Sequence, residues 1–148
     1  MNRLPFRIKR MRGSDHDAVA AFIASWSSDD VYLRFGTYGV ASVERYLQEL
    51  LRSQRAALLM SDGESCVAVL DYVEVNGEFH IGVFVAKRLR RRHLASSLLK
   101  ILLARVRSCE RVLASCSGEN RAAVALLRSC GFASTSIHRG DMEWSFMA

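Results

Sequence analysis

The hydrophobic pattern in the first third of the chain changes from the period of a strand to that of helices. Apolar and basic residues alternate over residues 6–11, which predicts a strand. Acidic residues follow Ser14, as is typical of a helix start, and we expect this helix to reach about residue 25. Residues 29–40 mix two glycines with aromatic residues and are expected to be irregular. Ser42 is expected to cap an amphipathic helix that ends near Arg55, with five apolar residues on one face: Val43, Tyr46, Leu47, Leu50 and Leu51.

The middle of the chain predicts an antiparallel meander, because apolar and polar residues alternate there in short runs. The expected strands are residues 56–60, 65–75 and 78–85. A turn is expected at residues 61–63, and Asn76-Gly77 is a strong signal of a two-residue hairpin turn.

The last third returns to alternating helices and strands. We expect a helix from His93 or Leu94 to about residue 107, a strand over residues 111–116, and a helix over residues 121–129 that ends at Gly131. Two closing strands follow. The predicted order is β-α-α-β-β-β-α-β-α-β-β, an α/β fold with a mixed sheet, and we expect residues 1–148 to form a single domain.

Length and composition exclude several classes of protein. The 148 residues are 50% hydrophobic and 24% charged with one proline, as expected of a compact domain with its own core. No uncharged apolar stretch is long enough for a membrane helix, and none follows the arginine-rich N-terminus as in a signal peptide, so we expect a cytoplasmic protein without a membrane partner. The four cysteines form no CxxC pair, and the histidines have no metal-ligand spacing. We expect no metal and reduced cysteines, with Cys116 and Cys130 filling the core.

The net charge of +6 is unevenly distributed. Residues 13–86 carry four basic and eleven acidic side chains, whereas residues 87–128 carry eleven basic and two acidic ones. This asymmetry suits an anionic ligand on one side and a cationic one on the other, for which the acidic stretch 62–78 is a candidate. The basic run at residues 87–93, Lys-Arg-Leu-Arg-Arg-Arg-His, fits a solvated surface, a nucleic-acid patch or a site for a small polyanion.

The position of the basic run in the predicted fold favours the polyanion site. The run joins the strand at residues 78–85 directly to a helix, so backbone N–H groups around residues 91–95 are expected to point outward at the helix N-terminus. Unpaired N–H groups at the positive end of a helix dipole form an anion-binding site.

Three motifs resemble the GNAT acetyltransferase superfamily. Residues 90–95, Arg-Arg-Arg-His-Leu-Ala, are similar to the family's Arg/Gln-x-x-Gly-x-Gly/Ala turn, which holds the pyrophosphate of acetyl-CoA. Residues 120–132 resemble its Asn-x-x-Ala-x-x-Leu-Tyr-x-x-x-Gly-Phe block, in which the asparagine contacts the cofactor. Residues 27–35 are similar to the Leu-Ser-x-x-x-Tyr-x-Arg-Phe segment of the bacterial protein-lysine type. The order and separation of the motifs extend the resemblance over nearly the whole chain.

The resemblance implies a set of residues that contact acetyl-CoA. The turn would hold the pyrophosphate, the asparagine would contact the cofactor, and backbone N–H groups on the fourth strand would polarise the thioester carbonyl. Asparagine is also a common helix cap, a role compatible with cofactor contact. The expected cofactor-binding residues are Phe84, Val85, Arg90, Arg91, Arg92, His93, Leu94, Ala95 and Asn120.

The resemblance also implies a general base on the fourth strand, because an amine acceptor must lose a proton before it attacks the thioester. The candidates are Glu78 and His80, which strand alternation places on one face with Gly82 and Phe84. A merely structural or exposed role for Glu78 and His80 is the alternative.

Two positions depart from the family pattern. His93 stands where the family has glycine, and a bulky residue held at positive φ would cost about 1–2 kcal/mol, whereas a helical φ would remove this objection. Leu127 stands where many members have the tyrosine that protonates the departing CoA thiolate, and its loss would lower the rate roughly 10²–10⁴-fold.

We therefore expect an acetyl-CoA-dependent N-acetyltransferase that acts on a primary amine by direct attack. Protein lysine, a free amino acid and a polyamine all remain open as acceptors, although the segment at residues 32–35 favours protein lysine. The first alternative is a CoA-binding or acyl-CoA-binding module without useful catalysis. A nucleic-acid-binding domain, which rests on the basic run and the basic N-terminus, is the other alternative and is less favoured. The hydrophobic periodicity shows no dimer face distinct from the core, and a homodimer stays open as an oligomeric state.

Overall fold

The computed structural model describes residues 6–147 except 36–39, 53, 91 and 107–109. Two short 3₁₀ turns, η1 (Gly13–Asp15) and η2 (Lys87–Leu89), accompany the main elements. These elements are β1 (Arg7–Arg10), α1 (His16–Ala24), α2 (Ser28–Phe35), α3 (Val40–Leu51), β2 (Ala56–Ser61), β3 (Cys66–Val75), β4 (Glu78–Val85), α4 (Leu94–Arg105), β5 (Arg111–Ser117), α5 (Arg121–Ser129), β6 (Ala133–His138) and β7 (Asp141–Met147).

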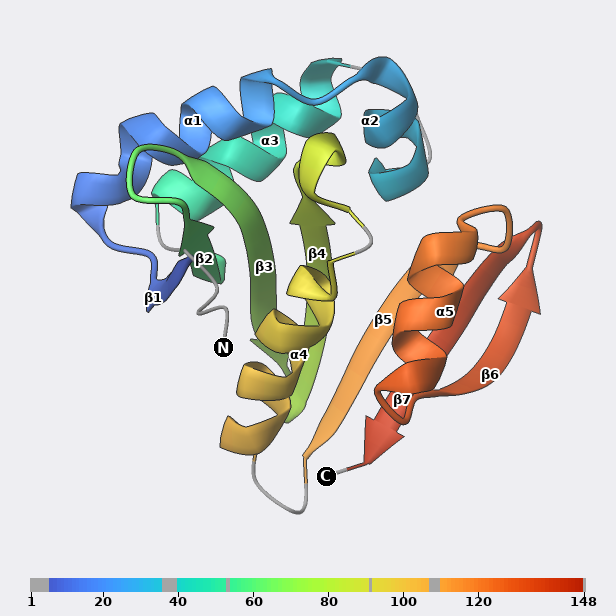
Figure 1. Ribbon diagram of the computed structural model, residues 1–148. Coiled ribbons are helices and arrows are strands. Elements are labelled where there is room, and N and C mark those ends of the chain that lie inside the picture. Colours follow the sequence, from blue (N-terminus) through green and yellow to red (C-terminus); the bar gives the residue numbers. More distant parts are fainter. Residues whose placement is uncertain (1–5, 36–39, 53, 91, 107–109, 148) are drawn as a thin grey trace.

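The described strands form one seven-stranded sheet in the order β1-β2-β3-β4-β5-β7-β6 (Figure 1). Neighbouring strands pair antiparallel except β4 and β5, which run parallel. The last strand, β7, lies between β5 and β6, so both of its neighbours precede it in the chain. The sheet is therefore mixed, and the expected α/β class is confirmed.

Helices cover both faces of the sheet and create two core clusters. On one face α1 and α3 pack against the strands through side chains such as Phe22 and Tyr46. On the other face α4 and α5 form a larger cluster with Leu98 and the buried Trp144. Because side chains alternate along a strand, adjacent residues belong to opposite core clusters. Full burial of each large apolar side chain contributes roughly 1.5–3 kcal/mol to the stability of the fold.

The hairpin between β3 and β4 fixes the register of the central strands. Asn76 and Gly77 have φ values of 53° and 79°, as a type I′ turn requires. The turn pairs Val75 with Glu78, and the antiparallel ladder then continues without a break to the Ala68–Val85 pair. The expected bounds of β4 are confirmed.

The segment at residues 29–40 differs from its expected irregular structure, since it contains all but the first residue of α2. The physical reason is a capping box that opens this helix. The Asp30 N–H donates to Ser27 Oγ at 3.1 Å, and the Ser27 N–H donates to Asp30 Oδ2 at 3.4 Å. Helix α3 begins at Val40 rather than after the expected cap at Ser42. Within the described residues, no helix has the length and apolar character needed to span a membrane.

Candidate active site

Strands β4 and β5 pair at only one end and then diverge. Their parallel register consists of three pairs and ends at His80–Leu113. Beyond it, β4 remains paired with β3 as far as Val85, and β5 remains paired with β7 as far as Ser117. The facing edges of β4 and β5 therefore separate toward the C-terminal end of β4 (Figure 1).

Backbone polar groups of β4 point into this divergence. The Ala86 N–H donates to the Val67 carbonyl at 2.8 Å, toward β3. Hydrogen-bonded pairs alternate along an antiparallel ladder, so the N–H of Phe84 also points toward β3. The N–H groups of Val83 and Val85 then point toward β5, where the register provides no partner strand. Of the two expected backbone contacts, only the Val85 N–H faces the divergence.

Helix α4 begins at the same end of β4 and presents free N–H groups. The Ser97 N–H donates to the His93 carbonyl at 3.1 Å, which is the first bond within the helix. The N–H groups of Leu94, Ala95 and Ser96 precede that bond and have no acceptor inside the helix. Together with the helix dipole they form an anion-binding arrangement next to the divergence.

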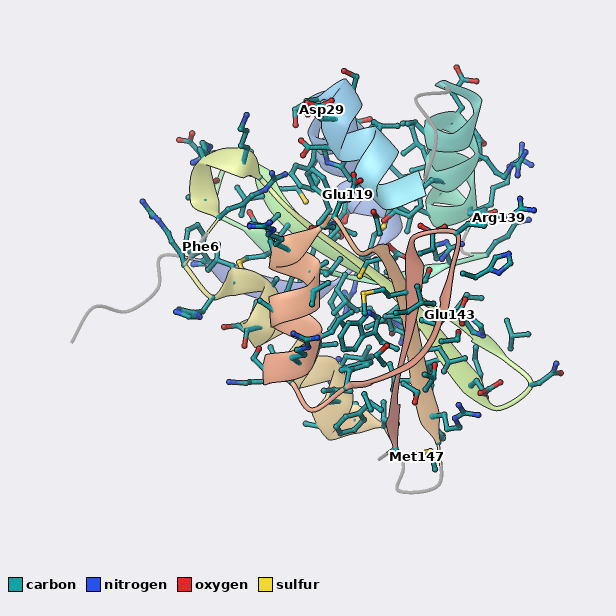
Figure 2. All side chains as sticks on the ribbon, turned by 90° about the vertical axis from the view of Figure 1, so that its right-hand side faces the viewer. Phe6, Asp29, Glu119, Arg139, Glu143 and Met147 are labelled. Atoms are coloured by element: carbon teal, nitrogen blue, oxygen red, sulfur yellow. The ribbon has the colours of Figure 1, made fainter. Side chains whose placement is uncertain are left out.

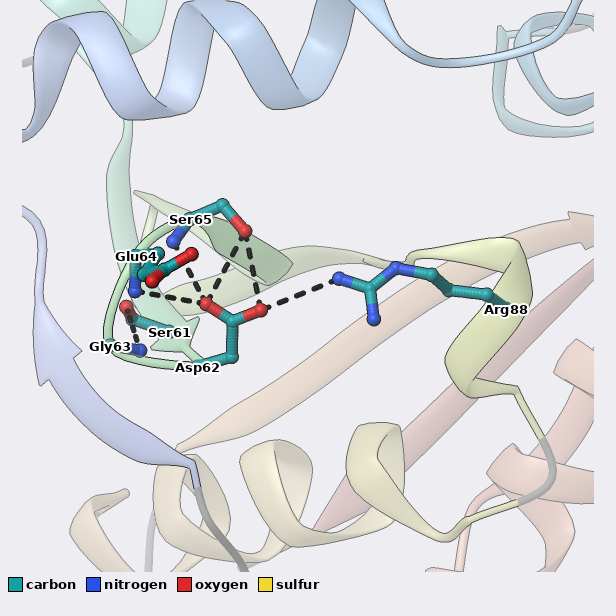
Figure 3. Close-up of polar contacts among 6 residues, drawn as sticks. All are labelled: Ser61, Asp62, Gly63, Glu64, Ser65 and Arg88. Carbon is teal, nitrogen blue, oxygen red and sulfur yellow. Dashed lines mark hydrogen bonds and ion pairs between the residues drawn. The ribbon is translucent and has the colours of Figure 1, made fainter.

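The arginines of the basic run differ in what they contact. Arg88 reaches back to the β2–β3 turn, where Nη2 lies 3.4 Å from Asp62 Oδ2 (Figure 3). Backbone N–H groups of Ser65 and Glu64 donate to this carboxylate and, with Arg88, lower the Asp62 pKa. Arg92 is exposed and forms no ion pair with any residue that the structure describes.

Arg90 has a different environment from Arg88 and Arg92. Its Nη2 lies 2.9 Å from Asp30 Oδ1 in α2, and its Nε donates to the Val85 carbonyl at 3.2 Å. Its side chain therefore points toward α2 rather than toward the start of α4. Arg91 lies outside the described residues.

The two candidate bases lie at different distances from the divergence. His80 is exposed and belongs to the last pair that joins β4 to β5. Glu78 is two residues farther away, about 6.6 Å along the strand, and its carboxylate forms an ion pair with Arg111 at 3.3 Å. The register also pairs Gly82 with Asp71 and Phe84 with Val69, so these residues share the face that α1 and α3 cover.

Asn120 caps α5, because its Oδ1 accepts the Ala123 N–H at 3.2 Å. This bond gives one backbone N–H group at the start of the helix an acceptor. It leaves the side-chain Nδ2 of Asn120 without a partner among the described residues. Leu127 is 4% exposed and belongs to the α4–α5 core cluster. No acid–base group therefore occupies the position of the family tyrosine.

The described cysteines behave as expected of core residues. Cys66, Cys116 and Cys130 are free thiols, and Cys109 lies outside the described residues. Burial raises the pKa of the Cys66 thiol to about 11 and also raises that of Cys116. Both thiols are therefore poor nucleophiles at neutral pH.

The acidic stretch 62–78 does not form one uniform acidic surface. Three of its carboxylates form ion pairs with arginines of the chain itself: Asp62 with Arg88, Asp71 with Arg55 and Glu78 with Arg111. Glu78 lies opposite Arg111 in the parallel register of β4 and β5, a pairing that no local sequence signal indicates.

His93 adopts the left-handed conformation that the family's glycine adopts without strain. Its φ is 60° and its ψ is 23°, so the backbone strain expected of a bulky residue at positive φ is present. We expect His93→Gly to raise the free energy of unfolding by about 0.5–1 kcal/mol, because relief of roughly 1–2 kcal/mol of strain exceeds the extra entropy of glycine in the unfolded chain. Urea unfolding measures the change.

His93→Ala is the matched control for this prediction. Alanine removes the imidazole but keeps a Cβ at positive φ, so we expect it to be less stable than the glycine variant by about 1 kcal/mol. Equal stability of the two variants would mean that backbone strain at this position is negligible.

Several solved structures share this fold at less than 25% sequence identity. The GNAT domain of the S. lividans protein PAT superposes with a TM-score of 0.78 at 20% identity, over 95% of this chain and 89% of that one. The yncA protein of Salmonella typhimurium, solved with acetyl-CoA, gives 0.75 at 14% identity over 96% and 93%. Spermidine N-acetyltransferase from Vibrio cholerae, solved with CoA and spermine, gives 0.70 at 12% identity over 96% and 95%.

These likenesses show the fold, whereas the family follows from the sequence. A search of curated proteins gave no match. The sequence model of the acetyltransferase (GNAT) family, however, matches residues 17–132. This range includes the diverging strands, the turn before α4 and the helix that Asn120 caps. The chain belongs to the GNAT family of acetyltransferases.

Proposed function

We propose that the protein transfers the acetyl group of acetyl-CoA to a primary amine. The observation that carries the proposal is the position of the free N-terminus of α4 beside the unpaired edge of β4. An anion site and a row of outward backbone N–H groups thus lie at one end of the sheet. This combination suits a ligand with a pyrophosphate at one end and a carbonyl at the other.

Specific groups then have distinct roles in binding the acyl donor. The N–H groups of Leu94, Ala95 and Ser96 bind the pyrophosphate, helped by the charge of Arg92 and Arg91. The Val85 N–H donates to the thioester carbonyl and stabilises the negative charge that develops there. Asn120 contributes its free Nδ2 to the cofactor while its Oδ1 caps α5.

His80 is the better candidate for the general base. It lies where β4 and β5 separate, whereas Glu78 is farther away and bound to Arg111. His80 takes a proton from the acceptor ammonium, and the free amine nitrogen attacks the acetyl carbon. The new C–N bond forms as the C–S bond breaks, and the nitrogen loses its second proton to water to become the amide nitrogen. CoA leaves as a thiolate that takes a proton from water, because Leu127 has none to give.

The acceptor is proposed to be a cationic amine. The segment at residues 32–35 favours protein lysine, and the likeness to spermidine N-acetyltransferase favours a polyamine as the second class. Both classes present a primary amine that is mostly protonated at pH 7 and needs a base.

Turnover with a panel of amines tests the proposal and the base together. We expect CoA release from acetyl-CoA with at least one acceptor among spermidine, a lysine peptide and free amino acids. We expect His80→Gln to lower kcat about 10²–10³-fold, because it removes the base, and Glu78→Gln to change kcat less than threefold. A thiol-reactive dye measures the released CoA.

Thermal unfolding of both variants serves as the control for folding, since both side chains are at least partly exposed. Loss of turnover in Glu78→Gln with activity kept in His80→Gln would reverse the assignment of the base.

A CoA-binding module without catalysis is the second candidate, and the burial of Leu127 favours it. Binding of CoA with no release from any amine of the panel would support this candidate over the transferase.

A further inference from the structure

The side chain of Arg90 connects the turn before α4 to a helix 60 residues earlier in the chain. Its Nη2 donates to Asp30 Oδ1 at 2.9 Å, and its Nε donates to the Val85 carbonyl at 3.2 Å. Its guanidinium carbon lies 5.2 Å from the centre of the Phe84 ring, within the range of a cation–π contact. Two contacts thus hold the guanidinium on the end of β4, and the third connects it to α2.

Asp30 is held in place to receive this arginine. Its main-chain N–H donates to Ser27 Oγ, and its Oδ2 accepts the Ser27 N–H, which leaves Oδ1 for Arg90. Only 9% of the residue is exposed. Burial raises the pKa of this carboxyl, but the bonds and charge from Arg90 and Ser27 outweigh burial and lower the pKa below its ordinary value. Asp30 therefore stays ionised at neutral pH.

Helix α2 also contacts β5, so it extends from the end of β4 to the strand on the other side of the divergence (Figure 1). The Asp30–Arg90 pair fixes the β4 end of this bridge. The main chain of Arg90 lies within the turn to which the proposed function assigns the pyrophosphate. A ligand bound at this turn can therefore act on α2 through the bond between the Arg90 side chain and Asp30.

We propose that Arg90 is a positioning residue, and that its bond to Asp30 couples occupation of the cofactor turn to the placement of α2 over the diverging strands. This inference rests on the proposed function, because it takes CoA as the ligand of the turn. It differs from the sequence-based expectation that the Arg90 side chain binds phosphate. Its Nε and Nη2 are already bonded to the protein, whereas Arg92 is exposed and remains available for phosphate.

Hydrogen exchange of the α2 backbone amides, with and without CoA, measures the coupling. In the wild type we expect CoA to slow exchange in α2 at least fivefold. In Asp30→Asn, Arg90→Gln and the double variant we expect this effect of CoA to fall below twofold, and to be no smaller in the double variant than in either single one. Arg90→Lys keeps the charge but not the fork of donors, so we expect an intermediate effect.

Asp29→Asn is the matched control, because it removes the same charge from the same helical turn. Asp29 is exposed at the surface of α2 (Figure 2), and we expect its variant to keep the full effect of CoA. If the ion pair were merely structural, its loss in these variants would speed exchange in α2 equally with and without CoA. The ratio of the two rates therefore separates coupling from simple stabilisation.

Calorimetric titration with CoA distinguishes failure of this inference from failure of the proposed function. We expect CoA to bind Asp30→Asn within threefold of the wild-type affinity. If Arg90→Gln weakened CoA binding tenfold while Asp30→Asn strengthened it, Arg90 would be a phosphate ligand and the inference would be overturned. CoA binding to the wild type without protection of α2 would overturn the coupling alone. Absence of CoA binding would overturn the proposed function together with the coupling.

Discussion

We expect Ser96→Asp to weaken CoA binding about 100-fold and to leave the protein at least as stable as the wild type. Ser96 is in the first turn of α4, where its N–H has no acceptor inside the helix. A carboxylate there would bond the same N–H groups that the pyrophosphate needs and would repel the phosphates, which at about 4 Å amounts to several kcal/mol at an effective dielectric constant of 20. The same carboxylate favours the helix by about 0.3–1 kcal/mol.

Opposite signs for binding and stability make this a stringent test of the anion site. Calorimetric titration with CoA measures the affinity, and thermal unfolding measures the stability. Ser96→Asn is the matched control, because it has nearly the same shape without the charge, and we expect its affinity to remain within about fivefold of the wild type. If the aspartate variant bound CoA normally, the start of α4 could not be the phosphate site.

Local sequence signals predicted much of the fold correctly. Asn76-Gly77 permits a type I′ turn, and that turn alone determines which residues of β3 and β4 pair. The cap at Asn120 and the glycine after Cys130 likewise bound α5 at its expected residues. In each case the decisive interaction connects residues that are close in the chain, so a short stretch of sequence contains it.

Helix α2 was missed because two local signals conflict. The glycines and aromatic residues of the segment indicated irregular structure, whereas Ser27 and Asp30 have the spacing of a capping box. The capping box prevails, since it provides acceptors for the backbone N–H groups of Ser27 and Asp30 at the helix start. Ser-x-x-Asp at this position is the sequence signal that would have identified the helix.

The environment of the candidate site could not be predicted from local sequence. Arg90 is in the motif that indicates phosphate binding, but its ion-pair partner Asp30 is 60 residues away. The choice between Glu78 and His80 depends on where the parallel pairing of β4 and β5 ends, which is a property of the whole sheet. The orientation of the Val85 N–H depends on the same register. Long-range pairing therefore determines the chemistry of the residues that the motifs identify.

We expect Asp71→Asn to lower the free energy of unfolding by about 3 kcal/mol, the largest effect on stability among these predictions. Asp71 is 1% exposed, and it accepts bonds from Tyr46 Oη at 2.7 Å and Arg55 Nη1 at 3.0 Å. Removal of one charge from a buried pair leaves the other insufficiently compensated, which typically costs about 3–5 kcal/mol. For a domain of this size the melting temperature should fall by about 10 °C.

Glu49→Gln is the matched control, because Glu49 bonds the same guanidinium from the protein surface. Its carboxylate lies 2.9 Å from Arg55 Nη2, but its side chain is 30% exposed, so solvent screens the pair. We expect a loss of less than about 1 kcal/mol in urea unfolding. Equal losses in the two variants would show that burial does not govern this network. A much larger loss at Asp71 would show that this contact anchors α3 to β3, beside the strand that presents the Val85 N–H.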